Sequence, residues 1–147
     1  MNWSEMIVFN SRYKKFESTT SSIGNDIKYL FNSKTKIPTD GITCSFRPLL
    51  DGSVYVSFYG TSENSINKRA KFYISVYDSK GTTLATAEDS NTGSATFGAG
   101  VYINVSALQN YVVQVTCVPI EAEAVNNYLN NVKVRANLVD NIERYIV

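Results

Sequence analysis

The chain has 147 residues, enough for one domain with its own hydrophobic core and too few for two ordinary domains. Fourteen Lys and Arg residues against thirteen Asp and Glu give a formal net charge of +1. This balance excludes the strong positive field that gathers nucleic acid or an anionic membrane. Histidine is absent, so the commonest general base and every Ser-His or Cys-His nucleophile pair are excluded. We therefore expect a binding or structural protein that uses no cofactor or metal and is not an enzyme.

The two cysteines, Cys44 and Cys117, are too few for a zinc site and too far apart for a CxxC redox pair. The apolar run at residues 6–9 is shorter than the roughly seven residues that a signal peptide needs. No stretch approaches the ~18 apolar residues of a membrane span. Synthesis in the cytosol is therefore expected, which favours buried, reduced thiols over a disulfide.

Residues 1–41 differ in pattern from the rest of the chain and are predicted to form an N-terminal arm. A polar tract at residues 18–22 is typical of a linker, and residues 38–41 have turn chemistry. Between them, Ile27, Leu30 and Phe31 recur at helical spacing, which is compatible with one short helix.

From Ile42 onward apolar and polar residues alternate, as in half-buried strands. Strands at 42–47 and 54–59 flank a turn at 51–53 and are predicted to pair as a hairpin; strands at 72–77 and 82–87 form a second hairpin. Further strands are predicted at residues 94–97, 101–105, 111–120, 132–139 and 142–147, the last two as a final hairpin. Turn signals at roughly 8 to 12 residue spacing predict an all-β, jelly-roll-like antiparallel β-sandwich over residues 42–147.

Four tyrosines fall on the polar side of this alternation, and if their strands were neighbours the phenols would form a flat aromatic surface that stacks on sugar rings. Ordinary cross-strand pairing of tyrosines is the commoner explanation of such a pattern. The four residues are Tyr55, Tyr59, Tyr73 and Tyr77.

Two other patterns resemble chemical sites. The segment 89–93 begins like a calcium loop, but its glycine stands fifth instead of sixth and Gly100 occupies the place of the bidentate acid, so it is read as a turn. Glu121 and Glu123 would project on one face of an extended chain, as a glycosidase carboxylate pair does. These two acids are the only basis for an enzyme.

Apolar residues near both chain ends are candidate interface anchors. A free apolar strand at the C-terminus would be an exposed adhesive edge, and a lone tryptophan near the N-terminus is a typical docking residue. The candidates are Trp3, Met6, Phe9, Tyr145, Ile146 and Val147.

The segment 72–85, with V-Y-D-x-x-G followed by L-A, resembles a hairpin of bacterial prepeptidase C-terminal and related jelly-roll modules. The whole chain, a β-sandwich rich in Asn, Lys and Tyr with an N-terminal arm, is similar in style to small structural proteins of tailed bacteriophages. That second resemblance implies a virion component, such as a head decoration, neck or tail protein, made in the host cytoplasm. It would form homo-oligomers and contact other virion proteins. The alternative is a carbohydrate-binding module that uses the four tyrosines.

Overall fold

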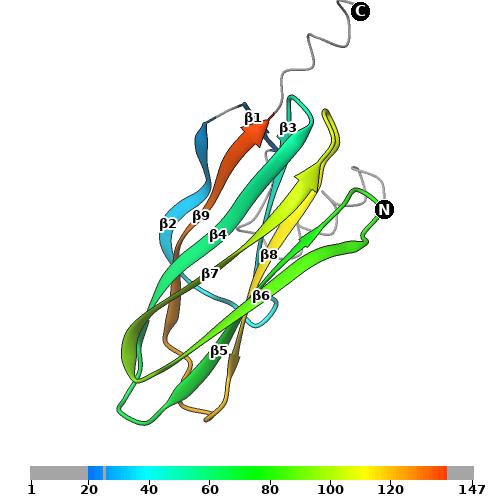
Figure 1. The fold of residues 1–147 in the computed structure, drawn as a ribbon. Helices are drawn as coiled ribbons and strands as arrows, with labels where there is room; N and C mark the ends of the chain where they lie inside the picture. Colours follow the sequence, from blue (N-terminus) through cyan, green and yellow to red (C-terminus); the bar gives the residue numbers. More distant parts are fainter. Residues whose placement is uncertain (1–19, 25, 139–147) are drawn as a thin grey trace, which may run out of the picture.

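The computed structural model describes residues 20–24 and 26–138, which fold into two packed β-sheets (Figure 1). In sheet A the strand order is β1-β3-β8-β5-β6, and in sheet B it is β2-β9-β4-β7. Within these residues no helix long and apolar enough to cross a membrane occurs. The strands are β1 (Ser21–Ile23), β2 (Ile27–Lys36), β3 (Ile42–Pro48), β4 (Gly52–Glu63), β5 (Arg69–Tyr77), β6 (Thr83–Thr92), β7 (Ser94–Val105), β8 (Tyr111–Pro119) and β9 (Asn127–Leu138).

The predicted fold class, an all-β sandwich, is confirmed, and its cause is the alternation of side chains along the strands. In β4, Val54, Val56 and Phe58 are buried between the sheets, whereas Tyr55 and Tyr59 point outward. Each fully buried side chain of this size contributes about 1.5–3 kcal/mol relative to leaving it in water. The sorting of every second residue therefore decides which face of each sheet becomes the core.

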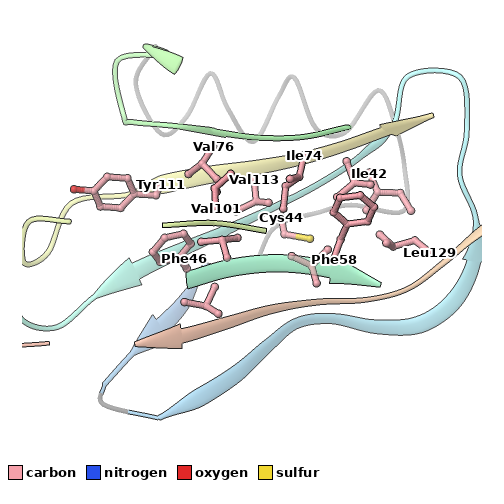
Figure 2. Close-up of a cluster of buried hydrophobic side chains, with 14 of the residues drawn as sticks. Ile42, Cys44, Phe46, Phe58, Ile74, Val76, Val101, Tyr111, Val113 and Leu129 are labelled. Carbon is pink, nitrogen blue, oxygen red and sulfur yellow. The ribbon is translucent and has the colours of Figure 1, made fainter. Parts of the chain in front are cut away.

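Aromatic contacts run through the core within each sheet, and one stack joins the two sheets. Phe97 of β7 stacks on Phe72 of β5, with ring centroids 3.5 Å apart and planes within 4°, and it also contacts Phe58. Near the other end of the core, Phe46 stacks on Tyr111 at 5.4 Å. Figure 2 shows other members of this core between the strands, including Ile42, Cys44, Ile74, Val76, Val113 and Leu129.

The hairpin predicted from residues 42–47 and 54–59 is wrong. Strand β3 pairs with β8, where Cys44 lies opposite Val113, whereas β4 pairs with β7 and β9 in the other sheet. The turn after β3 carries the chain from sheet A to sheet B. Alternation predicts that a segment is a strand, but it does not identify its partner. The second predicted hairpin, β5 with β6, is confirmed.

The region predicted as an arm contributes two strands to the sandwich. Strand β1 pairs in parallel with β3, and β2 pairs antiparallel with β9, so residues 21–23 and 27–36 belong to the sheets. The helical spacing of Ile27, Leu30 and Phe31 arises from a register shift after Tyr29, which lets Leu30 and Phe31 both pack against the core. The expected helix is therefore a bulged strand. Residues 1–19 of the predicted arm lie outside the described residues.

The bounds of the strands test the turn and the two strands that were predicted at residues 89–93, 111–120 and 132–139. The turn expected at residues 89–93 is confined to Gly93, whose φ is 69°, because β6 continues to Thr92. The strand predicted at residues 111–120 is confirmed as β8, with Tyr111, Val113 and Val115 buried. The predicted strand at 132–139 is part of β9, and residues 139–147, with the rest of the final hairpin, lie outside the described residues.

Both cysteines are free thiols, as expected from the sequence. Cys44 is buried in the core and Cys117 is half-buried on β8. Because burial disfavours the thiolate, the pKa of Cys44 rises to about 12 and that of Cys117 to about 11.

A buried amide cluster closes the end of the sandwich where β4 meets the loop before β9. Asn127 Oδ1 accepts hydrogen bonds from Ser62 Oγ at 2.7 Å and Asn64 Nδ2 at 2.9 Å. Its Nδ2 donates to the carbonyl oxygen of Ala124 at 2.8 Å. Because these partners satisfy Asn127, the amide can be buried without a large desolvation cost.

We expect Gly60→Ala to lower the free energy of unfolding by about 1–3 kcal/mol, since overpacking a tight core costs that much. A Cβ at Gly60 would collide with the Phe97 ring and with the carbonyl oxygen of Tyr128. Gly24→Ala is the control, because a Cβ there has no non-neighbouring atom of the described residues within 4 Å. Urea denaturation measures both variants, and equal stability of Gly60→Ala and the parent chain would contradict this packing.

We expect the free energy of unfolding to fall between pH 9 and pH 11 in part through Cys44. The unfolded thiol ionises near pH 9, whereas the folded thiol stays protonated until about pH 12, so the stability present below pH 9 is lost as the pH rises. One such thiol contributes a slope of about 1.4 kcal/mol per pH unit. Chemical denaturation of Cys44→Val should show a flatter decline over this range; parallel curves for variant and parent would refute the assignment.

Candidate functional site

The outer face of sheet B gathers tyrosines and basic side chains in rows that run across the strands. In the first row, Tyr55 lies between Tyr102 of β7 and Arg135 of β9, and Arg135 lies next to Ile27 of the edge strand β2. Directly opposed residues on neighbouring strands have Cβ atoms about 4.5–5.5 Å apart, so these side chains form one continuous surface. We call the outer face of sheet B the tyrosine face; it extends across the sheet from Ile27 on the edge strand β2 to Tyr102 on the edge strand β7.

The second and third rows continue the tyrosine face. Ser57 is flanked by Gly100 and Lys133, and Lys133 lies opposite Tyr29. In the third row, Tyr59 lies between a glycine of β7 and Asn131. The outward tyrosines of sheet B are therefore Tyr29, Tyr55, Tyr59, Tyr102 and Tyr128.

Tyr55 and Tyr102 form an aromatic pair that a glycine holds in place. Their ring centroids are 4.6 Å apart and the planes are inclined by 44°. The Tyr55 ring lies over Gly100, where a Cβ would overlap its Cζ and Oη atoms. Tyr102 is 71% exposed, so the pair presents ring surface to solvent. The missing side chain at Gly100 therefore leaves the space in which the Tyr55 ring lies against β7.

A shallow hollow of about 380 Å³ opens beside this pair. On the side away from Tyr102, the guanidinium carbon of Arg135 lies 5.7 Å from the Tyr55 ring centroid, a cation–π distance. Aromatic walls with a few polar groups are typical of small-molecule sites. The hollow is lined by Ser53, Val54, Tyr55, Tyr102, Arg135, Ala136 and Asn137.

The four tyrosines predicted as one surface divide between the two outer faces. Tyr55 and Tyr59 lie on the tyrosine face, whereas Tyr73 and Tyr77 lie on β5 in sheet A, which faces the other way. Tyr77 is half-buried, and its hydroxyl donates to Gln114 Oε1 at 3.4 Å. The condition for a single surface, that β4 and β5 be neighbours, is not met.

Tyr29, Tyr102 and Arg135 were missed as site residues. Tyr102 alternates with Val101 and Ile103, and Arg135 with Val134, so the sequence marks both as outward-facing. What the sequence lacks is the pairing of β7 and β9 with β4, which places these side chains beside Tyr55.

The two acids considered for catalysis are engaged in ion pairs with the β5 end of sheet A. Glu121 Oε1 lies 2.9 Å from Arg69 Nε, and Glu123 lies 3.6 Å from Lys68 Nζ. The hydrogen bond from Arg69 holds the pKa of Glu121 below its usual value. A catalytic acid needs a raised pKa, so the environment of Glu121 opposes that role.

Residues 89–92 of the segment that begins like a calcium loop belong to β6, and Gly93 forms the turn to β7. The carboxylate of Asp89 accepts hydrogen bonds from the backbone N–H groups of Ser90 at 2.8 Å and Gly98 at 2.9 Å, which ties β6 to β7. Across residues 20–24 and 26–138, no group of three or more metal-ligating side chains is found.

The interface anchors expected near the chain ends lie outside the described residues. They are Trp3, Met6, Phe9, Tyr145, Ile146 and Val147.

Comparison with known proteins gives the fold but no family. No protein-family model and no curated protein matches the sequence. Among solved structures, the Cry4Aa mosquito-larvicidal toxin from Bacillus thuringiensis has a TM-score of 0.50 at 13% identity, over 80% of this chain and 22% of the toxin. A likeness at this identity shows a shared β-sandwich and nothing of function.

Carbohydrate-binding modules also occur among the similar structures. The CBM36-1 domain of a xylanase from the Trinervitermes trinervoides hindgut metagenome has a TM-score of 0.46 and 14% identity, over 77% of this chain and 98% of that domain. The CBM6cm-2 module of Cellvibrio mixtus lichenase 5A, solved with cellotriose, has a TM-score of 0.44 and 12% identity, over 77% of this chain and 92% of that module.

The expected role as a bacteriophage virion component is corrected by these comparisons. The similar structures that they return include carbohydrate-binding modules, and nothing in them supports a virion, capsid or tail protein. The resemblance of residues 72–85 to prepeptidase C-terminal modules likewise finds no support. The hairpin pattern behind it belongs to β-sandwiches in general.

We expect Gly100→Ala to displace the Tyr55 ring, because the new methyl group would occupy the ring's position. The ring currents that each phenol exerts on the other should change, which NMR of the Tyr55 and Tyr102 ring protons would detect. Gly24→Ala should leave those resonances unmoved. Unchanged Tyr55 and Tyr102 signals in Gly100→Ala would show that the ring does not rest on Gly100.

Proposed function

We propose that this chain is a non-catalytic carbohydrate-binding β-sandwich and that the tyrosine face is its glycan-binding surface. The observation that carries the proposal is the Tyr55–Tyr102 pair beside the hollow that Arg135 lines. The similar solved structures support the β-sandwich fold alone.

The chemistry of a sugar ring fits this surface. A pyranose has a face of C–H groups and a rim of hydroxyls, so it is recognised by an aromatic face together with hydrogen-bonding groups placed at the side. The negative face of a phenol ring attracts the partly positive C–H groups. Tyr102 and Tyr55 supply the aromatic surface, and Ser53, Arg135 and Asn137 supply hydrogen-bonding groups around the hollow.

Several large aromatic and apolar side chains on the tyrosine face are exposed, and packing of the core does not explain why they are there. Tyr102 is 71% exposed, Ile27 56%, Tyr29 49% and Tyr59 44%. Single apolar residues scattered over a surface are ordinary, whereas exposed aromatic and apolar side chains gathered on one face mark an interaction site. Here they lie on both sides of Arg135 and Lys133 of β9. A flat, open face is suited to an extended chain of sugars, because successive rings can lie across the rows.

We expect Tyr102→Ala to weaken glycan binding at least about tenfold, as loss of an aromatic anchor commonly does. The side chain is largely exposed, so the far-UV circular dichroism spectrum should not change. Affinity electrophoresis through gels that contain xylan, β-glucan, pectin, alginate or dextran measures retardation. Tyr73→Ala is the matched control, since it removes a phenol from the opposite face.

Two results would contradict the proposal. Absence of retardation in every gel would refute glycan binding. Equal loss of retardation in Tyr102→Ala and Tyr73→Ala would refute the tyrosine face as its location.

A further inference from the structure

Two cations of the tyrosine face have no acidic partner within residues 20–24 and 26–138. Lys133 and Arg135 lie two residues apart on β9 and point to the same side, with Cα atoms about 6.6–6.8 Å apart. Among the described residues, neither forms an ion pair. Every ion pair seen in that part of the chain uses a different cation: Lys34 with Glu63, Lys68 with Glu123, and Arg69 with Glu121.

The three rows of the tyrosine face contain no acidic side chain. Their members are Ile27, Tyr29, Asn32, Asn131, Lys133, Arg135, Tyr55, Ser57, Tyr59, Gly98, Gly100 and Tyr102. Among the described residues, the nearest acids by register are Asp26, just beyond Ile27 at the edge of the sheet, and Asp51, just before β4, where its Oδ1 accepts a hydrogen bond from the Ala107 N–H. Glu63 lies at the far end of β4 and is paired with Lys34. The chain as a whole carries +1, so two unpaired cations on one face are a local excess.

The position of Arg135 makes this excess part of the hollow. Its guanidinium lies beside the Tyr55 ring and lines the hollow together with Tyr102 and Asn137. The ring contact leaves the N–H groups of the guanidinium available, because a cation–π contact uses the face of the group and not its hydrogen-bonding edge. Lys133 lies one row further along, between Ser57 and Tyr29.

We infer that the glycan bound at this face is acidic: Tyr55 and Tyr102 stack on a sugar ring while Arg135 and Lys133 bind the carboxylate or sulfate groups of the same chain. This inference rests on the proposed function and names its substrate class. The planar fork of Arg135 matches the two oxygens of a carboxylate or sulfate, and Lys133 acts as a second point charge. A neutral glycan would leave both charges without a partner, so the inference predicts selectivity between glycans of equal size.

The test compares polysaccharides that differ only in charge, with the full chain as the protein. Polygalacturonate and alginate are each paired with their esterified, neutral forms, and dextran sulfate is paired with dextran. The first two pairs test carboxylates and the third tests sulfate. We expect the acidic member of at least one pair to bind about tenfold or more tightly than its neutral partner at low salt, as measured by isothermal titration calorimetry. That preference should shrink as NaCl rises toward 0.5 M, because salt screens exposed charges.

The variants locate the preference. The double variant Arg135→Gln and Lys133→Gln should bind the acidic and neutral members equally. Lys71→Gln should keep the preference, because it removes one charge from an exposed position on β5, on the opposite face. Preserved circular dichroism spectra would show that all variants fold.

The outcomes separate the inference from the proposed function. Equal binding of acidic and neutral members, with Tyr102→Ala weakening both, overturns the inference and leaves glycan binding intact. An acidic preference that survives in the double variant also overturns the inference, since the charge would be read elsewhere. Failure of every polysaccharide to bind overturns both proposals.

Discussion

The period of two along each strand is the constraint on which the rest of this protein depends. In β4, Val54, Val56 and Phe58 are buried against the other sheet. Because successive side chains point to opposite faces, Tyr55 and Tyr59 must face outward. The same rule turns Lys133 and Arg135 outward on β9 because Val132 and Val134 are in the core. The candidate binding surface is thus fixed by the packing of the opposite side of the same sheet. A slip of one residue in register would bury the tyrosines and charges and expose the core.

Two glycines in sheet B lower the stability of their strands but leave space in which an aromatic ring packs. A glycine inside a strand costs roughly 0.5–1 kcal/mol relative to alanine. Gly100 nevertheless lies in the middle of β7, and the space it leaves is filled by the Tyr55 ring from the neighbouring strand. Gly60 on the same sheet makes the corresponding space on the inner side, where Phe97 packs. One glycine therefore serves the surface and the other the core, and a methyl group would disturb each for a different reason.

The net charge of the chain differs from the local charge on the tyrosine face. A net charge of +1 argues against a general attraction to polyanions such as nucleic acid. Folding nevertheless separates the charges: Glu121 and Glu123 neutralise Arg69 and Lys68 at the β5 end of sheet A, while Arg135 and Lys133 remain beside the tyrosines. A balanced composition is therefore compatible with a local cationic site for an anionic ligand, because such a site depends on the charges near the ligand and not on the net charge of the chain.

The sequence by itself determined the strand-forming segments from residue 42 onward, their buried faces and the two free cysteines, because alternation and composition are local properties. It identified Tyr55 and Tyr59 as outward-facing for the same reason. Only the tertiary structure decided that β3 and β4 lie in different sheets, that residues 27–36 form a bulged strand, and that Tyr73 and Tyr77 lie on the far side. It also decided that Tyr102 and Arg135 flank Tyr55, from strands that are distant in sequence. Strand partnership is set by the packing of the whole core and leaves no signature in the spacing of residues within any one strand.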